Sequence, residues 1–393
     1  MNRYEWKLNV RKPVMTHLPI PYPKVIYGKN SRFKILDLLK KDSIHKICIF
    51  SSHTVYQSGA LDKILEGLMD KDVVLVHKIP SDPGTTCIDQ LTEKAQGCQA
   101  VLAIGGGSVI DAAKAVCGCL AEQKECRDIF GTMKIHHKPP LLIACPTTAG
   151  TGSEGTVAAV ITDDQSHLKR QILDLKLVPD YAVLDSQLTM SLPASITAQT
   201  AMDALTHALE AYVSTYAIKT TDRYATLAIR LILDKLPYLL EDGQNERLRQ
   251  DLLIAAYFAG LAFTRAYVGY VHAYAHAIGA RYHIPHGQAV AVLLPYVMEY
   301  YVPVCDEKLS SLAIQCGIGQ KDKDSAANAM ELIDAIHTLN KKGRIPSYVE
   351  NFPEEDIPIV IKQAFRECHG NYPVPRYYNE QAARNLLEKV CAR

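Results

Sequence analysis

Short apolar runs rich in β-branched residues alternate with helical patterns through the first half of the chain. The strand-like runs cover residues 46–50, 73–77, 100–104, 141–144, 157–162 and 181–184. Segments with the apolar spacing of helices lie between them, at residues 61–69, 88–96 and 109–120. Strands that alternate with helices in this way are typical of a parallel sheet covered on both faces. The pattern therefore predicts an α/β domain.

The pattern changes near residue 190, where β-branched alternation nearly disappears. Helical spacing then dominates residues 194–212, 221–240, 248–263, 272–280 and 326–339. The full length of 393 residues exceeds the roughly 100–200 expected of one domain. We predict a Rossmann-like α/β domain over residues 1–190, followed by an all-helical domain over residues 191–393.

Composition excludes several classes of function. Lysine plus arginine (43) nearly balances aspartate plus glutamate (42), so the basic excess of a nucleic-acid-binding protein is missing. The longest nearly apolar stretch, residues 252–264, is shorter than the about 20 residues that span a bilayer. Eleven cysteines without a C-x-x-C pair favour a reducing compartment. We expect a cytoplasmic protein with neither a nucleic-acid nor a membrane partner.

Two turns rich in glycine and hydroxyl groups follow neighbouring strand patterns. The first is Gly105-Gly106-Gly107-Ser108, and the second covers residues 145–154. Glycines let a backbone approach a ligand closely, and a helix N-terminus offers N–H groups to phosphate. The first turn matches neither the G-x-G-x-x-G nor the P-loop pattern. Its alternative interpretation is an ordinary turn in which Ser108 caps the helix and Asp111 completes a capping box. Ligands of open α/β sheets bind at such strand ends, which favours a nucleotide.

Acidic and histidine residues recur at helical spacing in the second half. Asp203 and His207 are four residues apart, as are His272 and His276, and His286 follows in a Pro-His-Gly turn. Such pairs face the same side of a helix, among small apolar neighbours. Imidazole and carboxylate groups on a buried surface suit a divalent metal ion. Spacing leaves open whether His276 or His286 joins Asp203, His207 and His272 as the fourth ligand, and a plain Asp–His hydrogen bond is the alternative.

In this order, the motifs resemble those of the iron-containing (group III) alcohol dehydrogenase family over nearly the whole chain. The most specific are Pro-Thr-Thr-Ala-Gly-Thr at residues 146–151, Met-Asp-Ala-Leu-Thr-His-Ala-Leu-Glu-Ala-Tyr at residues 202–212, and the spacing of the three histidines from His272 to His286. The resemblance implies a dehydroquinate synthase-like architecture and a homodimer. It also implies metal-dependent, NAD(P)-linked interconversion of small alcohols and aldehydes or ketones by hydride transfer.

The resemblance further implies roles for individual residues. It assigns the metal to Asp203, His207, His272 and His286, and it places His276 beside the substrate as the catalytic proton relay. The implied cofactor-binding residues are Ser52, Gly105, Gly106, Gly107, Ser108, Asp111, Thr147, Thr148, Thr151, Lys169 and Leu188. Fe2+ is expected by resemblance, and Zn2+ suits the same donors.

One position departs from the family pattern. Many NAD-using members carry an aspartate after the first strand, where the carboxylate binds the ribose 2′-hydroxyl and repels a 2′-phosphate. Ser52 occupies the matching position in this chain. We therefore expect that NADP is accepted as well as NAD, with the preference open.

Three other functions are compatible with some of these motifs. A glycerol dehydrogenase-like zinc enzyme would share the fold but act on polyols. A metal-dependent phosphohydrolase or lyase would also use a His/Asp cluster but would need no nicotinamide. A nucleotide sensor would bind the cofactor without turnover.

Overall fold

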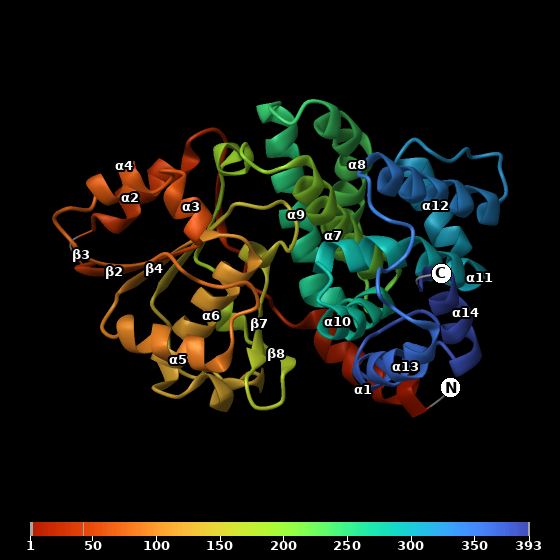
Figure 1. Cartoon of the computed structure of the whole chain (residues 1–393), viewed down its shortest axis with the longest axis horizontal. Coiled ribbons are helices and arrows are strands. Elements are labelled where there is room, and N and C mark those ends of the chain that lie inside the picture. The colour runs from red at the N-terminus through yellow and green to blue at the C-terminus, as the bar shows by residue number, and fades with distance from the viewer. Residues whose placement is uncertain (1–2, 42, 392–393) are drawn as a thin grey trace. The chain divides into compact units, whose positions relative to one another are not determined.

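The computed structural model describes residues 3–41 and 43–391, which form two compact units (Figure 1). One unit is Ile20–Ser191, and the other joins Leu192–Arg393 to the N-terminal segment that ends at Pro19. This differs from the predicted division, which assigned the first 19 residues to the α/β domain. The helix α1 (Arg3–His17) packs with the helical unit instead, because the Arg265 guanidinium donates hydrogen bonds to the Met15 and Leu18 carbonyls at 2.7 and 2.6 Å.

The α/β unit contains a six-stranded sheet in the order β1-β9-β6-β4-β2-β3, and every pairing in it is parallel. Its strands are β1 (Lys24–Tyr27), β2 (Lys46–Ser51), β3 (Asp72–Val76), β4 (Ala100–Gly105), β6 (Leu141–Pro146) and β9 (Tyr181–Leu184). A second sheet consists of β5 (Gly131–Thr132), β8 (Leu168–Leu173) and β7 (Ala158–Asp163), in that order, with β7 antiparallel to β8. The predicted parallel sheet is confirmed.

Strand β4 shows why this sheet lacks a polar face. Val101 and Ala103 belong to one buried apolar cluster, whereas Leu102 and Ile104 belong to another. Alternate side chains of a strand point to opposite faces, so both faces of the sheet are buried. The helices of this unit are α2 (Ile35–Leu39), α3 (His53–Gln57), α4 (Asp62–Glu66), α5 (Thr85–Lys94) and α6 (Gly107–Glu122).

The described residues of the second unit form helices joined by loops and contain no strand, which confirms the predicted fold class. Its helices after α1 are α7 (Ala194–Val213), α8 (Lys219–Glu241), α9 (Glu246–Ala266), α10 (Tyr270–Tyr282), α11 (His286–Gln315), α12 (Ser325–Lys342), α13 (Ile357–Cys368) and α14 (Glu380–Val390). Helix α7 packs against α8, α9 and α11, and α10 packs against α11 and α13. A helix that is apolar nearly all round, such as α7, is stable only when other helices surround it.

Helix α11 is long and apolar enough to cross a bilayer by length and composition. However, 67% of its most apolar window is buried inside the protein. Helices α9 and α10 together pass the same test, but they are bent by 103° at the break between them. In the described part of the chain, α11 is the core helix against which α7, α10 and α12 pack.

Candidate metal centre and nucleotide loops

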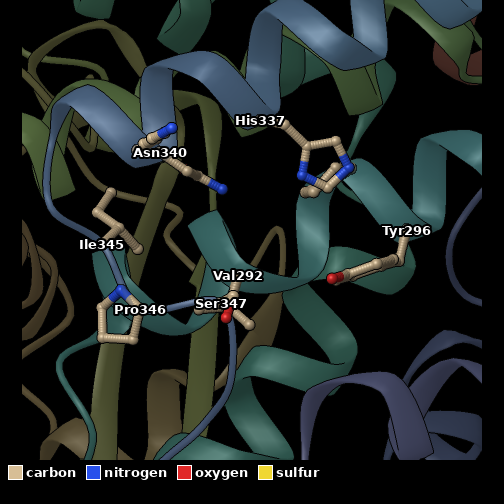
Figure 2. A pocket seen from close by; sticks show the side chains of 9 residues that line it. Val292, Tyr296, His337, Asn340, Ile345, Pro346 and Ser347 are labelled. Carbon is tan, nitrogen blue, oxygen red and sulfur yellow. The ribbon is translucent and has the colours of Figure 1, made fainter.

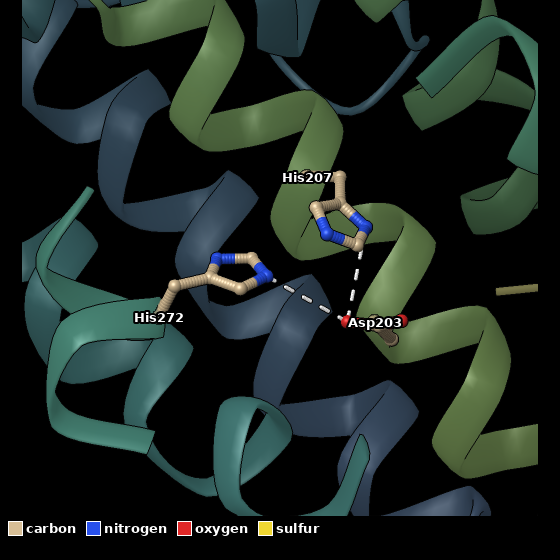
Figure 3. Close-up of side chains that lie close together, drawn as sticks. All are labelled: Asp203, His207 and His272. Carbon is tan, nitrogen blue, oxygen red and sulfur yellow. Dashed lines mark ion pairs between the residues drawn. The ribbon is translucent and has the colours of Figure 1, made fainter. Parts of the chain in front are cut away.

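Three buried side chains converge between α7 and α10 (Figure 3). Asp203 and His207 lie one turn apart on α7, and His272 comes from the start of α10. Oδ1 of Asp203 lies 3.7 Å from Nδ1 of His207 and 3.7 Å from Nε2 of His272. The i, i+4 spacing on α7 places its two side chains on one face, as the sequence pattern predicts.

The facing atoms of this cluster have no hydrogen-bond partner. Oδ1 of Asp203, Nδ1 of His207 and Nε2 of His272 are all buried and unpaired. Leaving one such atom unsatisfied costs about 1–3 kcal/mol. Each of the three residues offers one ligand atom that lies within 4.8 Å of those of the other two, so one cation could contact all three residues. This donor set therefore fits a divalent metal ion.

Two further histidines border the cluster and differ in their partners. His286, at the start of α11, brings Nε2 to 3.5 Å from Oδ1 of Asp203. His276, one turn after His272 on α10, stacks its ring on that of His286 with centroids 5.3 Å apart. Its Nδ1 forms a hydrogen bond of 2.8 Å with Oε1 of Glu367 on α13. Of the two ligand sets that spacing leaves open, this geometry favours the one with His286.

Glu210 of α7 contacts the cluster, although its position in the sequence did not predict this role. Its Oε2 lies 2.6 Å from Nδ1 of His272 and accepts the backbone N–H of Gly269 at 2.7 Å, while Oε1 accepts that of Val271 at 2.7 Å. A carboxylate at Nδ1 holds the proton there and leaves Nε2 with a lone pair toward Asp203. Glu210 follows Asp203 by seven residues, so the helical period places both on one face.

The Asp203 carboxylate stays ionised in the cluster, so its negative charge can attract a cation. Burial opposes ionisation of Asp203, but His207, His272 and His286 outweigh it and hold the carboxyl pKa well below its usual range. Burial lowers the pKa of His207 to about 3, although Asp203 acts in the other direction. Burial also disfavours the charged form of His272, yet the nearby carboxylates of Asp203 and Glu210 raise its pKa to about 9. A bound cation would replace that proton.

In the α/β unit, the first glycine-rich turn joins β4 to α6. A Cβ on Gly105 would lie 2.5 Å from Cγ2 of Val109, and a Cβ on Gly107 would lie 2.5 Å from Cγ2 of Thr151. These two positions therefore require glycine for packing. A Cβ on Gly106 would approach Oγ1 of Thr148 only to 3.6 Å, an ordinary contact.

The start of α6 differs from the capping arrangement that the sequence left open. The N-cap residue is Gly106, and no side chain accepts a hydrogen bond there. Oγ of Ser108 instead accepts the backbone N–H of Asp82 at 3.3 Å. Asp111 does not complete a capping box, because its Oδ1 accepts from the Ser153 hydroxyl at 2.6 Å and its Oδ2 from the Val160 N–H at 2.9 Å. The helix N-terminus thus keeps N–H groups without a side-chain cap, as anion binding requires.

The second turn, which carries Thr147, Thr148 and Thr151, lies beside the first. Strands β4 and β6 are neighbours, with Gly105 opposite Pro146, and the Thr147 N–H donates to the Gly105 carbonyl at 2.9 Å. Parallel strands that end at the same edge bring their loops together, which is the arrangement that the sequence predicts.

A fully buried lysine on α6 holds this second turn. The Lys114 amine donates to the carbonyls of Ser153 at 2.5 Å, Thr156 at 2.9 Å and Ala158 at 2.9 Å. It also donates to the Thr156 hydroxyl at 2.8 Å. This role of Lys114 was not predicted, although a single lysine in an apolar helical segment is a signal of a buried cation with partners.

The remaining predicted cofactor residues all have partners within the α/β unit. The Ser52 hydroxyl caps α3 by accepting the Val55 N–H at 3.3 Å. Lys169 of β8 forms an ion pair of 2.7 Å with Asp82, whose N–H reaches Ser108 beside the glycine turn. Leu188 is buried in one apolar cluster of the sheet. Lys169 is thus connected to the first turn, whereas Asp111 and Leu188 act in packing and loop support.

A recess of about 300 Å³ opens between α11 and α12 (Figure 2). Val292, Tyr296, His337 and Asn340 are among its lining residues, and none of the predicted site residues contributes to it. The Asn340 amide donates to the Ala291 carbonyl at 2.6 Å, a contact that ties α12 to α11. The recess is therefore distinct from the carboxylate–histidine cluster.

Comparisons with known proteins identify the family. Residues 22–186 match the family model described as iron-containing alcohol dehydrogenase, and residues 197–391 match the C-terminal model of the Fe-containing alcohol dehydrogenase family. The chain is 33% identical over 366 residues to the NAD-dependent methanol dehydrogenase of Bacillus methanolicus, covering 91% of this chain and 96% of that protein. It is 32% identical over 382 residues to the NADPH-dependent butanol dehydrogenase of Clostridium saccharobutylicum, covering 93% and 96%.

Solved structures give the same result. The crystal structure of a 1,3-propanediol oxidoreductase superposes with a TM-score of 0.90 at 30% identity, covering 94% of this chain and 98% of that one. Both halves of the chain and the order of its motifs thus agree with one family. The chain belongs to the iron-containing alcohol dehydrogenase family and is a metal-dependent, NAD(P)-linked oxidoreductase that interconverts alcohols and aldehydes.

Proposed function

We propose that Asp203, His207, His272 and His286 hold the divalent metal ion. The observation that carries this proposal is the set of three buried, unpaired atoms that face one another from α7 and α10. One carboxylate and three imidazoles suit Fe2+ and Zn2+ alike, and family membership favours iron. Glu210 supports the site by fixing the ring of His272.

We propose that the two turns of the α/β unit bind the cofactor. Gly105, Gly106, Gly107 and Ser108 take the pyrophosphate at the start of α6, and Thr147, Thr148 and Thr151 supply hydroxyl groups beside it. Support comes from the uncapped helix N-terminus and from the space over Gly106. Because Ser52 provides no carboxylate against a 2′-phosphate, NADP is accepted. Relatives named for NAD and for NADPH are compatible with either preference.

We propose that His276 moves the proton of the reaction. When bound, the metal ion polarises the substrate oxygen as a Lewis acid, and the nicotinamide ring takes or gives the hydride. His276 accepts the hydroxyl proton when the alcohol is oxidised and returns it when the aldehyde is reduced. The Phe263 ring stacks on His207 at 4.3 Å and helps to keep water from the cluster. The substrates are small alcohols, diols or aldehydes.

The test is a panel of simple alcohols, diols and aldehydes assayed with NAD(H) and NADP(H) on protein of defined metal content. We expect turnover with iron or zinc, measured by absorbance of the reduced nicotinamide, and its loss after chelation. Turnover confined to polyols with zinc would instead support a glycerol dehydrogenase-like enzyme. Phosphate release without nicotinamide turnover would support a phosphohydrolase, and cofactor binding without turnover would support a sensor.

Gly106→Ala tests the cofactor loop. The added methyl group meets only ordinary contacts with the protein, so the melting temperature should change little. The methyl group would, however, stand between the backbone and a bound pyrophosphate. We therefore expect the KM for the cofactor to rise about tenfold or more. A tenfold rise corresponds to about 1.4 kcal/mol of binding free energy. The matched control is Gly243→Ala in the helical unit, where a Cβ lies 3.5 Å from the Arg249 side chain. An unchanged cofactor KM in Gly106→Ala would contradict the assignment.

We also propose a cytoplasmic location and a homodimer. None of the eleven cysteines forms a disulfide in the structure, which is compatible with a reducing compartment. The dimer rests on the family resemblance, and light scattering of the purified protein measures it directly.

A further inference from the structure

We propose that Glu367 is a positioning residue for His276, with Tyr372 holding the carboxylate in place. This inference rests on the proposed role of His276 as the proton relay. It concerns one hydrogen-bonded set of side chains from α10, α13 and the segment after α13, all within the helical unit.

The contacts define a short chain of hydrogen bonds. Oε1 of Glu367 lies 2.8 Å from Nδ1 of His276 and accepts the Tyr372 hydroxyl at 2.7 Å. The side chains of His276 and Glu367 are 22% and 32% exposed, so the pair lies at the edge of the packed α10–α13 interface. Tyr372 is buried, which fixes the direction from which its hydroxyl approaches.

The carboxylate determines which nitrogen of His276 carries the proton. A neutral imidazole has one N–H and one lone pair, and a carboxylate accepts hydrogen bonds only. Burial works against the charge on Glu367, but His276 and Tyr372 outweigh it and lower its pKa, so the group is an ionised acceptor at neutral pH. The Nδ1–H tautomer follows, and Nε2 keeps the lone pair that a proton relay needs.

The same pairing of a histidine Nδ1 with a glutamate occurs one turn earlier on α10. His272 and His276 lie four residues apart, and each has its Nδ1 held by a glutamate from another helix, Glu210 of α7 or Glu367 of α13. At His272 this leaves Nε2 toward Asp203, 3.7 Å away. The two histidines thus share one tautomer, and one glutamate serves the metal cluster while the other serves the relay.

A role in stability alone does not account for Glu367. A carboxylate that is one-third exposed is screened by water, so its pair with a histidine contributes little to folding. The effect of Glu367 is to fix the orientation and the tautomer of the His276 ring, which stacks on His286 beside the cluster. Removing it should let the ring rotate and exchange tautomers without unfolding the protein.

The experiment compares Glu367→Ala, Glu367→Gln and Tyr372→Phe in the metal-loaded enzyme. We expect kcat to fall about 10–100-fold in Glu367→Ala, with metal content, cofactor KM and melting temperature unchanged. Glu367→Gln keeps an oxygen that can accept from Nδ1 and should recover most of kcat. Tyr372→Phe should give a smaller loss than Glu367→Ala. The matched control is Glu299→Ala, which removes a carboxylate of 29% exposure facing His337 outside the site and should leave kcat unchanged.

A second readout is independent of turnover. In zinc-loaded protein labelled with 15N-histidine, the signals lost in His276→Ala identify the relay ring. We expect the Nδ1–H tautomer in the native protein and in Glu367→Gln, and a mixture in Glu367→Ala. A native kcat together with a native tautomer in Glu367→Ala would overturn the inference, while the proposed function would stand. If the enzyme lacks dehydrogenase activity altogether, the proposed function fails and the tautomer still decides the role of Glu367.

Discussion

Asp203→Asn is expected to abolish metal binding and to reduce turnover by about a thousandfold or more. Oδ1 of Asp203 is the one atom that faces all three proposed histidine ligands, at 3.7 Å from His207, 3.7 Å from His272 and 3.5 Å from His286. Asparagine keeps the shape but supplies no negative charge to a buried divalent ion. Metal analysis after dialysis and the alcohol assay measure the two effects.

The contrasting variant is His276→Ala, which should retain its metal and lose turnover. Asp234→Asn on α8 serves as the control, because this exposed aspartate forms an ion pair with the neighbouring Lys235 and takes no part in the cluster. Full metal content in Asp203→Asn would overturn the proposed ligand set. Loss of metal in His276→Ala would instead restore the alternative in which His276 is the fourth ligand.

Sequence periodicity predicted the pairs of this site but could not choose among its histidines. Spacing along one helix fixes which side chains share a face, so Asp203 with His207 and His272 with His276 could be recognised from residue numbers alone. Whether His276 or His286 reaches the cluster depends on how α11 packs against α10, which no local pattern contains. In the structure, His276 turns its Nδ1 to α13, and His286 approaches Asp203.

The supporting carboxylates were missed for the same reason. Glu210 and Glu367 contact histidines 62 and 91 residues away in sequence, and a glutamate on a helix is usually solvated. The first 19 residues were assigned to the α/β unit from their order in the chain. In the structure, Arg265 and Tyr216 donate hydrogen bonds to carbonyls of α1 and of Leu18, and these contacts bind the segment to the helical unit. Both strand-end loops could be predicted, since the position of a turn after a parallel strand is set by local sequence and topology together.

Substitution of Lys114, the buried lysine that holds the second turn, is expected to have the largest effect on stability. Lys114→Met should lower the free energy of unfolding of the α/β unit by about 3–5 kcal/mol, because it leaves buried carbonyls without a donor and removes the positive charge near Asp111 and the buried Glu154. Methionine keeps a similar volume on an apolar helix, so the loss reports the missing hydrogen bonds and charge rather than a cavity. Urea unfolding measures it, and Lys94→Met, an exposed position on α5, is the control.

The same variant should change how stability depends on pH. Burial lowers the pKa of Lys114 to about 8 from 10.5, although Asp111 and Glu154 act in the opposite direction. Between these two values the unfolded chain binds more protons at this position than the folded protein does, so the contribution of Lys114 to stability rises with pH across that window. The difference in unfolding free energy between the native protein and Lys114→Met should therefore widen from pH 8 to pH 10. If the difference in unfolding free energy stayed constant over that range, the Lys114 amine would be charged in both the folded and the unfolded state. The four hydrogen bonds of Lys114 alone would then account for the stabilisation of the loop.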